Sequence, residues 1–532
     1  MKNLKVYILS ALLTATATTA TAGGILTNTN QSIDFLRNPA RDAAIGLDGV
    51  YSNPAGVAFL SEGFHLGLNW QYAHQTRTVT TTNDLFKLGA KNNGEATKTF
   101  EGVADAPVIP SIQAAWNKGD WSFQFNFSIP GGGGKCEFDK GVGSFETAVG
   151  AIATKLGATS TMLNKAMNLF DAGVPNVTGY DVDGYMKGRQ YYFGVQLGAA
   201  RKITENLSVY GGLRLLYGSA RYEARLNNIR VMDGNNGIGL NDYFNAVTKG
   251  FVTAQTNGAD PAKQVAYVGR LVAVGMSPAG AAQTLEDAGE KLQTAAPALE
   301  ASADALRPYA ENGMNLKSDQ TGWGIAPVLG VDYKIGDFNF AAKYEFKTRM
   351  RMKNNSDLES ALIPATAKYV DGTSVPEDAP ALLTVGAQWS VLDNVRLDLG
   401  YHHFFDTDAH WYENSQELLD GGTNEYLAGV EWDINDQFTV SAGGQLTRYQ
   451  LTDAYMNDIS FVVNSYSFGF GLNYKLSNVV TLKAAYFQTN YEDYDMDTPE
   501  QNMSELGISI PAGHTSFTRT NRVFGLGCDI TL

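Results

Sequence analysis

The chain has 532 residues, and its 26 Tyr, 26 Phe and 56 Gly with only 18% charged residues are typical of an all-β protein with tight turns and aromatic girdles. A formal net charge of -15 argues against nucleic acid as a partner, because nucleic acid selects basic surfaces. The sequence has no run of the about 18 to 20 apolar residues that a membrane-spanning helix needs, so a helical membrane protein is excluded.

The first 22 residues have the organisation of an export signal. A basic start is followed by the apolar run 6–13, and the segment ends in Ala20-Thr21-Ala22, a small-x-small cleavage site. This order predicts a secretory signal peptide over residues 1–22, too short to span a membrane. The mature chain is therefore expected to begin at Gly23.

From residue 63 onward, apolar and polar residues alternate in many segments. In 121–129, for example, aromatic residues alternate with Ser, Gln and Asn, and in 338–347 the residues Lys343, Glu345 and Lys347 share the polar face. Such alternation is typical of a strand between lipid and lumen. A β-sandwich also alternates, but its strands are shorter and its apolar face meets a second sheet.

Very short turns join these strands in pairs, and long polar stretches separate the pairs, which is the pattern of bacterial outer-membrane barrels. The predicted fold class is therefore all-β, a 14-stranded antiparallel transmembrane β-barrel over residues 63–532 in the bacterial outer membrane. The even number of strands places both ends in the periplasm. The expected strands are 63–82, 106–117, 120–130, 186–203, 207–226, 318–335, 337–355, 379–392, 395–407, 423–434, 437–450, 463–476, 479–492 and 517–532.

Two long loops have helical rather than strand character. Residues 143–171 show helical spacing of apolar residues, and residues 240–312 are rich in Ala. Both are expected to form helices over the outer mouth of the barrel. They are either a surface cap or a gate that first captures the ligand.

The segment 23–62, ahead of the first strand, shows no strand alternation. Barrels of 8 strands are filled by their own side chains, while those of 16 to 18 enclose an aqueous channel. A barrel of fourteen strands lies between and would leak unless something filled it. The segment is therefore predicted to form a hatch inside the barrel.

Small residues in this segment lead into Asn53-Pro54-Ala55-Gly56, just before the first strand. In that place the motif resembles the hatch motif of the FadL family, outer-membrane transporters of long-chain fatty acids and aromatic hydrocarbons. The resemblance covers residues 23–532, with further similar stretches at 128–131, 207–220, 322–324 and 344–349. Two departures are the loop 227–317, which is longer than expected, and Leu532, where Phe is usual.

The resemblance implies a route for the ligand. An apolar compound would bind among the outer loops, move to a pocket beside the hatch, and leave sideways through a gap where the third strand is kinked and the hatch motif packs. Pro130 and Gly131 fit this kink, because proline belongs at an edge or bulge and the four glycines from Gly131 permit strained backbone. Asn53 is expected to bond to the exposed backbone, which needs partners inside the membrane. Alternatively, Pro130 ends the strand and begins an outer loop.

Alternation places several cations on the lumen face, and three are candidate contacts for a ligand's head group: Arg214, Lys343 and Arg396. Arg has the best shape for a carboxylate. The alternative is that such charges pair with one another in a ladder across the lumen. No catalytic, cofactor or metal site is expected, because the six histidines have no recognisable catalytic partner and no Gly-x-Ser-x-Gly occurs.

The expected function is passive uptake of hydrophobic small molecules, namely long-chain fatty acids or similar lipophiles, by a monomeric barrel that is not an enzyme. Its other contacts would be outer-membrane lipid and lipopolysaccharide. A sideways exit suits such ligands, because each buried CH₂ gains roughly 0.8 kcal/mol. One alternative is a scaffold barrel that holds a surface or secreted protein partner on the helical loops. Another is a porin for polar solutes, against which a hatch argues.

Overall fold

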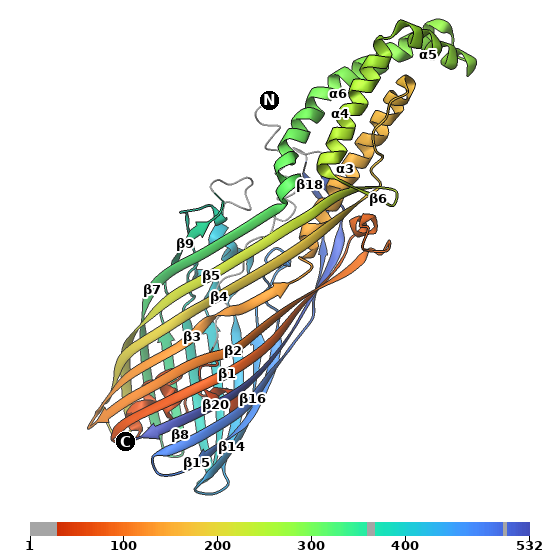
Figure 1. Cartoon of the computed structure of the whole chain (residues 1–532). Coiled ribbons are helices and arrows are strands. Elements are labelled where there is room, and N and C mark those ends of the chain that lie inside the picture. The colour runs from red at the N-terminus through yellow and green to blue at the C-terminus, as the bar shows by residue number, and fades with distance from the viewer. Residues whose placement is uncertain (1–28, 359–367, 504–507) are drawn as a thin grey trace.

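The computed structural model describes residues 29–358, 368–503 and 508–532. The expected signal peptide lies outside these residues. Figure 1 shows a tilted β-barrel with a column of helices that rises from one rim. The short turns and the C-terminus lie at the opposite end of the barrel (Figure 1). No helix in the described parts of the chain is both long and apolar enough to cross a membrane.

The described strands close into a 14-stranded antiparallel barrel, which confirms the predicted fold class. Each strand pairs with the next along the chain, and the last strand, β20, pairs with β1 over almost its whole length. The barrel strands are β1 (Gly63–Thr82), β2 (Thr97–Lys118), β3 (Trp121–Phe138), β4 (Gly179–Lys202), β5 (Leu207–Asp233), β7 (Met314–Ile335), β8 (Phe338–Glu345), β11 (Leu382–Leu392), β12 (Val395–Phe404), β13 (Asn424–Asp433), β14 (Phe438–Arg448), β15 (Ser465–Lys475), β16 (Val480–Tyr491) and β20 (Gly513–Thr531).

Short strands extend the sheet at the end that carries the long loops. They are β6 (Asn236–Gly239), β9 (Arg351–Ser356), β10 (Ser374–Pro376) and β17 (Tyr494–Thr498), with a separate hairpin of β18 (Gln501–Met503) and β19 (Ile508–Ile510). The strand predicted over 337–355 is interrupted: β8 ends at Glu345 and β9 begins only at Arg351. This interruption changes which side chains face outward, as described below.

The strands bury one face and expose the other. On β7, large apolar residues are exposed at Trp323, Leu329, Val331 and Tyr333, while Asp332, between the last two, is buried. Exposed apolar side chains on alternate positions are the lipid-facing band of a transmembrane barrel, and the buried polar ones face its interior.

The barrel interior is filled by the segment that precedes β1. Residues 31–59 form one short helix and two 3-10 turns, namely α2 (Ile33–Arg37), η1 (Leu47–Val50) and η2 (Gly56–Phe59), and most of them are buried. In α2, Phe35 and Leu36 pack in one apolar cluster with the strand residues Phe487 and Val523. We call residues 29–62 the plug.

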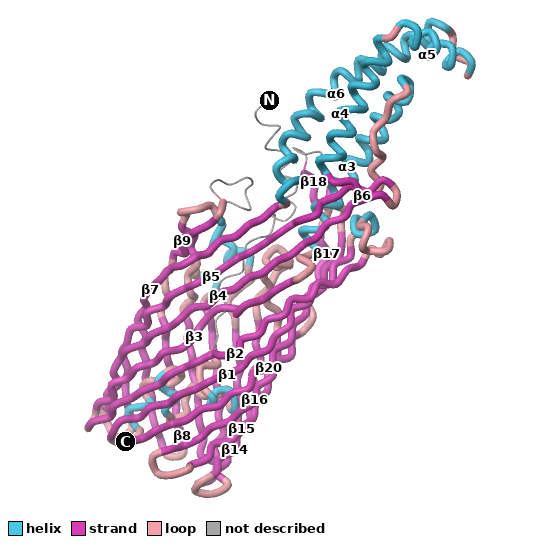
Figure 2. Tube along the Cα trace, in the orientation of Figure 1, coloured by secondary structure: helices cyan, strands magenta, loops and turns pink. Residues whose placement is uncertain are grey.

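The helical column consists of α3 (Gly143–Met167), α4 (Leu240–Ala259), α5 (Pro261–Ala273) and α6 (Pro278–Asn312). Figure 2 shows that these helices stand side by side, with α5 at the tip. Their inner faces share one apolar cluster that includes Val149, Phe244 and Leu285. The remaining described turns near the rim are η3 (Asp84–Leu88), η4 (Asn168–Phe170), η6 (Asp406–Asp408) and η7 (Tyr412–Leu418).

Candidate functional site: a break in the barrel wall and the plug beside it

The wall of the barrel is interrupted between β2 and β3. The two strands pair from Lys118↔Trp121 to Ile112↔Phe127, and again only at Val103↔Glu137 and Gly102↔Phe138. Among the described residues, no ladder joins 104–111 to 128–136. The pairing of β3 with β4 also slips on both sides of Gly131. Pro130 and Gly131 therefore lie at a break in the sheet, and the strand continues beyond them to Phe138.

The local sequence explains why the strand deforms here. Pro130 has no N–H to donate to a ladder. Gly132 has φ of +107° and Gly134 has φ of +70°, conformations that favour glycine. A Cβ on Gly132 would also collide with the backbone of Gln190 in β4. The glycine run thus permits an excursion of β3 that a residue with a side chain would oppose.

A plug residue, Gln31, takes the place of the missing strand partner. The Gln31 side-chain amide donates to the Ile129 carbonyl (3.1 Å), and the Ile129 N–H donates to Gln31 Oε1 (3.0 Å). On the β2 side, the Gln31 carbonyl accepts from Gln113 Nε2 (3.0 Å) and from the Ser111 hydroxyl. The buried residue Gln31 therefore supplies hydrogen-bond partners to the backbone of β3 and to side chains of β2, across the break.

Asn53 was expected to take this role, and that prediction is wrong. Asn53 Nδ2 donates instead to Asp332 Oδ2 of β7 (2.6 Å), and Asn53 Oδ1 accepts the Gly56 N–H (3.2 Å). Asn53 thus fastens its own turn to the wall at β7. Gln31 was missed because no pattern in 23–62 marks it, apart from the general need of unpaired backbone for a partner.

The rest of the motif also lies away from the kink. The Pro54 carbonyl accepts from Gln124 Nε2 (2.7 Å), and the Ala55 carbonyl accepts from the Ser208 hydroxyl (2.6 Å). Gln124 precedes Pro130 by six residues of β3, or about 20 Å of strand. The expectation that the motif packs near the kink is therefore also wrong, and the motif secures the plug to β3, β5 and β7 instead.

Two small cavities adjoin both the plug and β3. The lumen cavity is lined by residues that include Thr29, Tyr51, Pro130 and Arg214, together with apolar residues of β5, β7 and β11. The wall cavity lies at the break and is lined by Asn30, Gln31, Ala73, Ala104, Asp105, Ala106, Ile109, Ile129, Gly132, Gly133, Gly134, Lys135 and Tyr191 among others. They hold only about 40 and 80 Å³ of free space, whereas ligand pockets measure about 300–1,000 Å³. A long ligand can pass only if the plug or β3 moves.

One of the three predicted cations, Arg214, lines the lumen cavity, and a second, Lys343, pairs with Glu345, which also lines it. The guanidinium of Arg214 donates to Gln196 Oε1 (2.6 Å) and pairs with Glu345, which also pairs with Lys343 (2.7 Å). Both cations lie 4.8 Å from the centre of the Tyr51 ring. Two cations thus share one carboxylate, which leaves this group with an excess positive charge.

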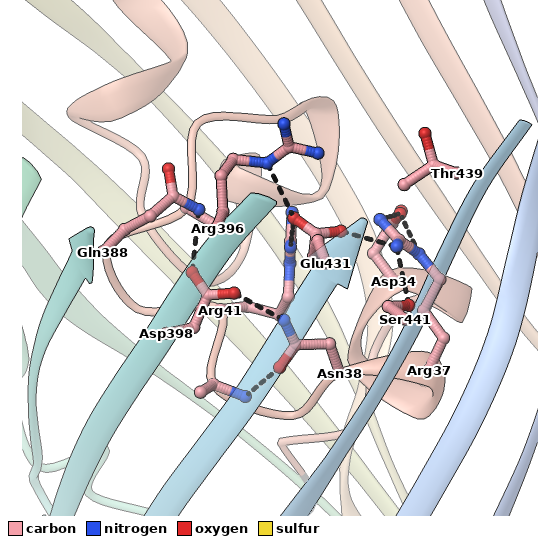
Figure 3. A network of polar contacts seen from close by, with 12 residues as sticks. Asp34, Arg37, Asn38, Arg41, Gln388, Arg396, Asp398, Glu431, Thr439 and Ser441 are labelled. Atoms are coloured by element: carbon pink, nitrogen blue, oxygen red, sulfur yellow. Dashed lines mark hydrogen bonds and ion pairs between the residues drawn. The ribbon is translucent and has the colours of Figure 1, made fainter. Parts of the chain in front are cut away.

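The third predicted cation, Arg396, lies elsewhere in the lumen. It pairs with Asp433 of β13 (2.6 Å). It also lies 3.7 Å from Glu431, as drawn in Figure 3. Because Arg396 is held by carboxylates in a different part of the barrel, it does not belong with Arg214 and Lys343. For Arg396, the structure shows the alternative, in which charged side chains in the lumen pair with one another.

Figure 3 shows that this second region is an ionic network that attaches the plug to the wall. Arg37 and Arg41 of the plug both reach Glu431 of β13, at 2.5 and 3.1 Å. Asp34 of the plug pairs with Lys483 of β16. Further links are Arg41–Asp48, Lys483–Asp529, Arg37 with Asp34, Arg37 with Ser441, and Asn38 with Asp398.

No known sequence family matches the chain, and no curated protein matches it by sequence. Its structure is similar to that of a Pseudomonas aeruginosa FadL homologue, with 12% identity, a TM-score of 0.56, and coverage of 96% of this chain and 100% of the other. The toluene transporters TodX of Pseudomonas putida and TbuX of Ralstonia pickettii also align, at 13% identity and TM-scores of 0.47 and 0.46. Both alignments cover 96% of this chain, and they cover 99% of TodX and 98% of TbuX. The resemblance to the FadL family is thus confirmed at the level of the fold, and the chain is a 14-stranded barrel of the bacterial outer-membrane type.

Proposed function

We propose that this barrel passively takes up hydrophobic compounds, long-chain fatty acids or similar lipophiles, and releases them sideways into the outer membrane between β2 and β3. The observation that carries the proposal is the unpaired stretch of β2 and β3, which is closed by side chains rather than by a ladder. The fold, similar to that of a FadL homologue, supports the same function. We further propose that the barrel acts as a monomer.

The arrangement of the two cavities supports a path through the wall. Thr29 and Pro130 line the lumen cavity, while Gln31, two residues from Thr29, and Ile129, next to Pro130, line the wall cavity. The contact between Gln31 and Ile129 is therefore the partition between them. Asp105 and Lys135, which also line the wall cavity, are exposed on the outside of the barrel. Displacing one plug residue from one strand would join lumen and membrane.

The excess positive charge of Arg214 and Lys343 supports a ligand with a carboxylate. Glu345 compensates only one of the two cations, so a ligand carboxylate would find a second partner there. The apolar residues Leu216, Val328 and Leu382 line the lumen cavity together with Arg214, and they suit an acyl chain. Solvation supplies the driving force, because a chain that gains roughly 0.8 kcal/mol per buried CH₂ prefers bilayer to periplasmic water.

Filling the wall cavity tests the exit. Gly133 lines this cavity, whereas Gly211 of β5 has open space beside it, so Gly133→Trp is the test and Gly211→Trp the matched control. We expect Gly133→Trp to lower uptake of labelled oleate about tenfold or more, in cells that lack their own fatty-acid transporter, with the control near wild type. Equal uptake by the two variants would show that the ligand does not leave through this break.

Changing the lumen cations tests the ligand class. Lys343→Met removes the cation that pairs with Glu345 beside the lumen cavity. A lost charged hydrogen bond of about 1.5 kcal/mol corresponds to a factor of about ten. We expect the KM for oleate uptake to rise about tenfold and the uptake of an uncharged alkane to change little. An equal change for both ligands would argue against recognition of a carboxylate.

A second candidate function is a scaffold that holds a protein partner at the cell surface. The observation that favours it is the helical column, which exposes apolar side chains at Met162, Val252, Val265 and Val274, the last of them 77% exposed. A stoichiometric partner that co-purifies with the full chain, and is lost when 240–312 is replaced by a short linker, would support this function. Retention of the partner without the column would contradict it.

A further inference from the structure

The break between β8 and β9 turns a row of basic residues from the inside of the barrel to the outside. Glu345 of β8 pairs with Val328 of β7, and Lys353 of β9 pairs with Thr321 of β7. The two pairs are eight residues apart along β8 and β9 but only seven residues apart along β7. One extra residue is thus accommodated in 346–352, as in a β-bulge. Lys343 before the bulge is buried, whereas the cations after it are not. We call these cations the basic stripe: Lys347, Arg349, Arg351 and Lys353.

Uninterrupted alternation would have placed Lys347 with Lys343 on the lumen face, as the sequence analysis expected, and the bulge makes that expectation wrong. Lys347 and its neighbour Phe346 both have exposed surface, while the residues that alternate with the stripe are buried. A one-residue shift transfers every later side chain to the opposite face.

The stripe is held firmly against the barrel. Gly322 and Gly324 of β7 lie so close to it that a Cβ on either would collide with the carbonyls of Arg351 and Arg349. The Met350 N–H donates to Asp378 Oδ1 (2.9 Å), and Met350 and Met352 lie in an apolar cluster. The cations therefore project from an ordered backbone.

The stripe lies where the lipid-facing band of the barrel ends. On β7, exposed apolar residues run from Ile335 to Trp323, which is 69% exposed. These twelve steps span about 40 Å of strand at 3.3 Å each, or about 30 Å across the membrane at a tilt of about 40°. This height accommodates an apolar band of about 25 Å together with the aromatic girdles at its edges. Thr321 and Lys353, one position beyond Trp323 on that face, therefore lie at the headgroups of the outer leaflet.

The charges of the stripe are available for a ligand. No ion pair to a carboxylate joins any of the four cations within the described residues, although the whole chain has a net charge of -15. Lys347 Nζ donates only to a carbonyl, that of Asp408 (2.6 Å). The stripe borders a groove of about 540 Å³ whose lining is Trp323, Lys347, Arg349, Met350, Arg351, Pro376, Asp378 and His410. Its one carboxylate, Asp378, is buried and accepts a backbone N–H.

We propose that the basic stripe and this groove bind the phosphate groups of a phosphorylated outer-leaflet lipid, with the chemistry of the lipid A part of lipopolysaccharide. Arg349 and Arg351 suit phosphate because a guanidinium donates two parallel hydrogen bonds to its oxygens. Trp323 is placed to lie at the interface against the first carbons of the acyl chains. This site is independent of the proposed transport through the wall.

Native mass spectrometry of the purified full chain tests the proposal. The test variant is Arg349→Gln with Arg351→Gln, and the control is Lys249→Gln with Lys291→Gln, two exposed cations of the helical column whose loss changes the net charge equally. Each protein is incubated with diphosphorylated lipid A or with zwitterionic phosphatidylethanolamine. Folding is checked by heat-modifiable migration in gels.

We expect wild type and control to retain lipid A and the test variant to retain about tenfold less. Phosphatidylethanolamine should bind equally to wild type, control and test variant. Its binding to wild type should be weaker than that of lipid A. Equal retention of lipid A by the test variant and the control would overturn the proposal. So would binding of phosphatidylethanolamine to wild type as strong as that of lipid A, because phosphate monoester charge would then not be recognised.

Discussion

The plug contacts the barrel in two very different ways on its two sides. Toward β12–β16 and β20 it is held by buried ion pairs, with Arg37 and Arg41 on Glu431 and Asp34 on Lys483. Toward the break between β2 and β3 it is held by the neutral hydrogen bonds of Gln31. Breaking a buried ion pair costs about 3–5 kcal/mol, whereas a neutral hydrogen bond contributes about 0.5–1.5 kcal/mol. The same segment is thus fixed on one side and readily released on the other.

The largest expected effect is on the fixed side. Glu431→Gln removes the carboxylate that Arg37 and Arg41 share, and leaves two buried guanidinium groups undercompensated. We expect the plug to be destabilised by about 3–5 kcal/mol. Labelling of a cysteine placed at the buried plug residue Ala40 should then become rapid, measured against Glu205→Gln in an exposed turn. Slow labelling in both variants would mean that the network does not hold the plug.

Gln31→Ala should have an intermediate and local effect. The change leaves the N–H and carbonyl of Ile129 without their plug partner, at a cost of about 1–3 kcal/mol for buried unpaired groups. We expect higher ion conductance through the purified barrel in planar bilayers, and little change in labelling at Ala40. If conductance stays at the wild-type level while Ala40 becomes reactive, the two sides of the plug are not independent.

The smallest effect is expected from Ser441→Ala. Arg37 donates to the Ser441 hydroxyl (2.7 Å), but Glu431 remains to compensate its charge. We expect a loss of about 1.5 kcal/mol, the low end for a hydrogen bond to a charged group, seen as a slight acceleration of labelling at Ala40. A loss as large as that of Glu431→Gln would show that the number of hydrogen bonds, rather than charge, fixes this side.

Much of the wall could be predicted from alternation alone. The first strand was expected at 63–82 and has these bounds, because a buried face enforces the two-residue period over its whole length. The break at Pro130 and Gly131 could also be anticipated, since proline and glycine change the backbone itself. These features depend on residues that are neighbours along one strand.

The interior could not be predicted to the same extent. Alternation shows that Arg214 and Arg396 face the lumen, but not that they lie in different parts of it. The role of Gln31 depends on strands about 80 to 98 residues away, and nothing in its local sequence marks it. Lys347 of the basic stripe was assigned to the wrong face because one extra residue reverses the alternation, and no proline or glycine lies in 346–352 to mark the bulge.

The one-sided attachment of the plug also constrains how the barrel assembles. Asp34 and Lys483 are 449 residues apart in sequence, and Asn38 and Asp398 are 360 apart. The plug is the first described part of the chain, yet its polar and charged partners lie on β12, β13 and β16, in the second half of the barrel. An intermediate without these strands has no site for the plug's arginines. We therefore expect the plug to dock only after these strands have joined the sheet, late in the assembly of the barrel.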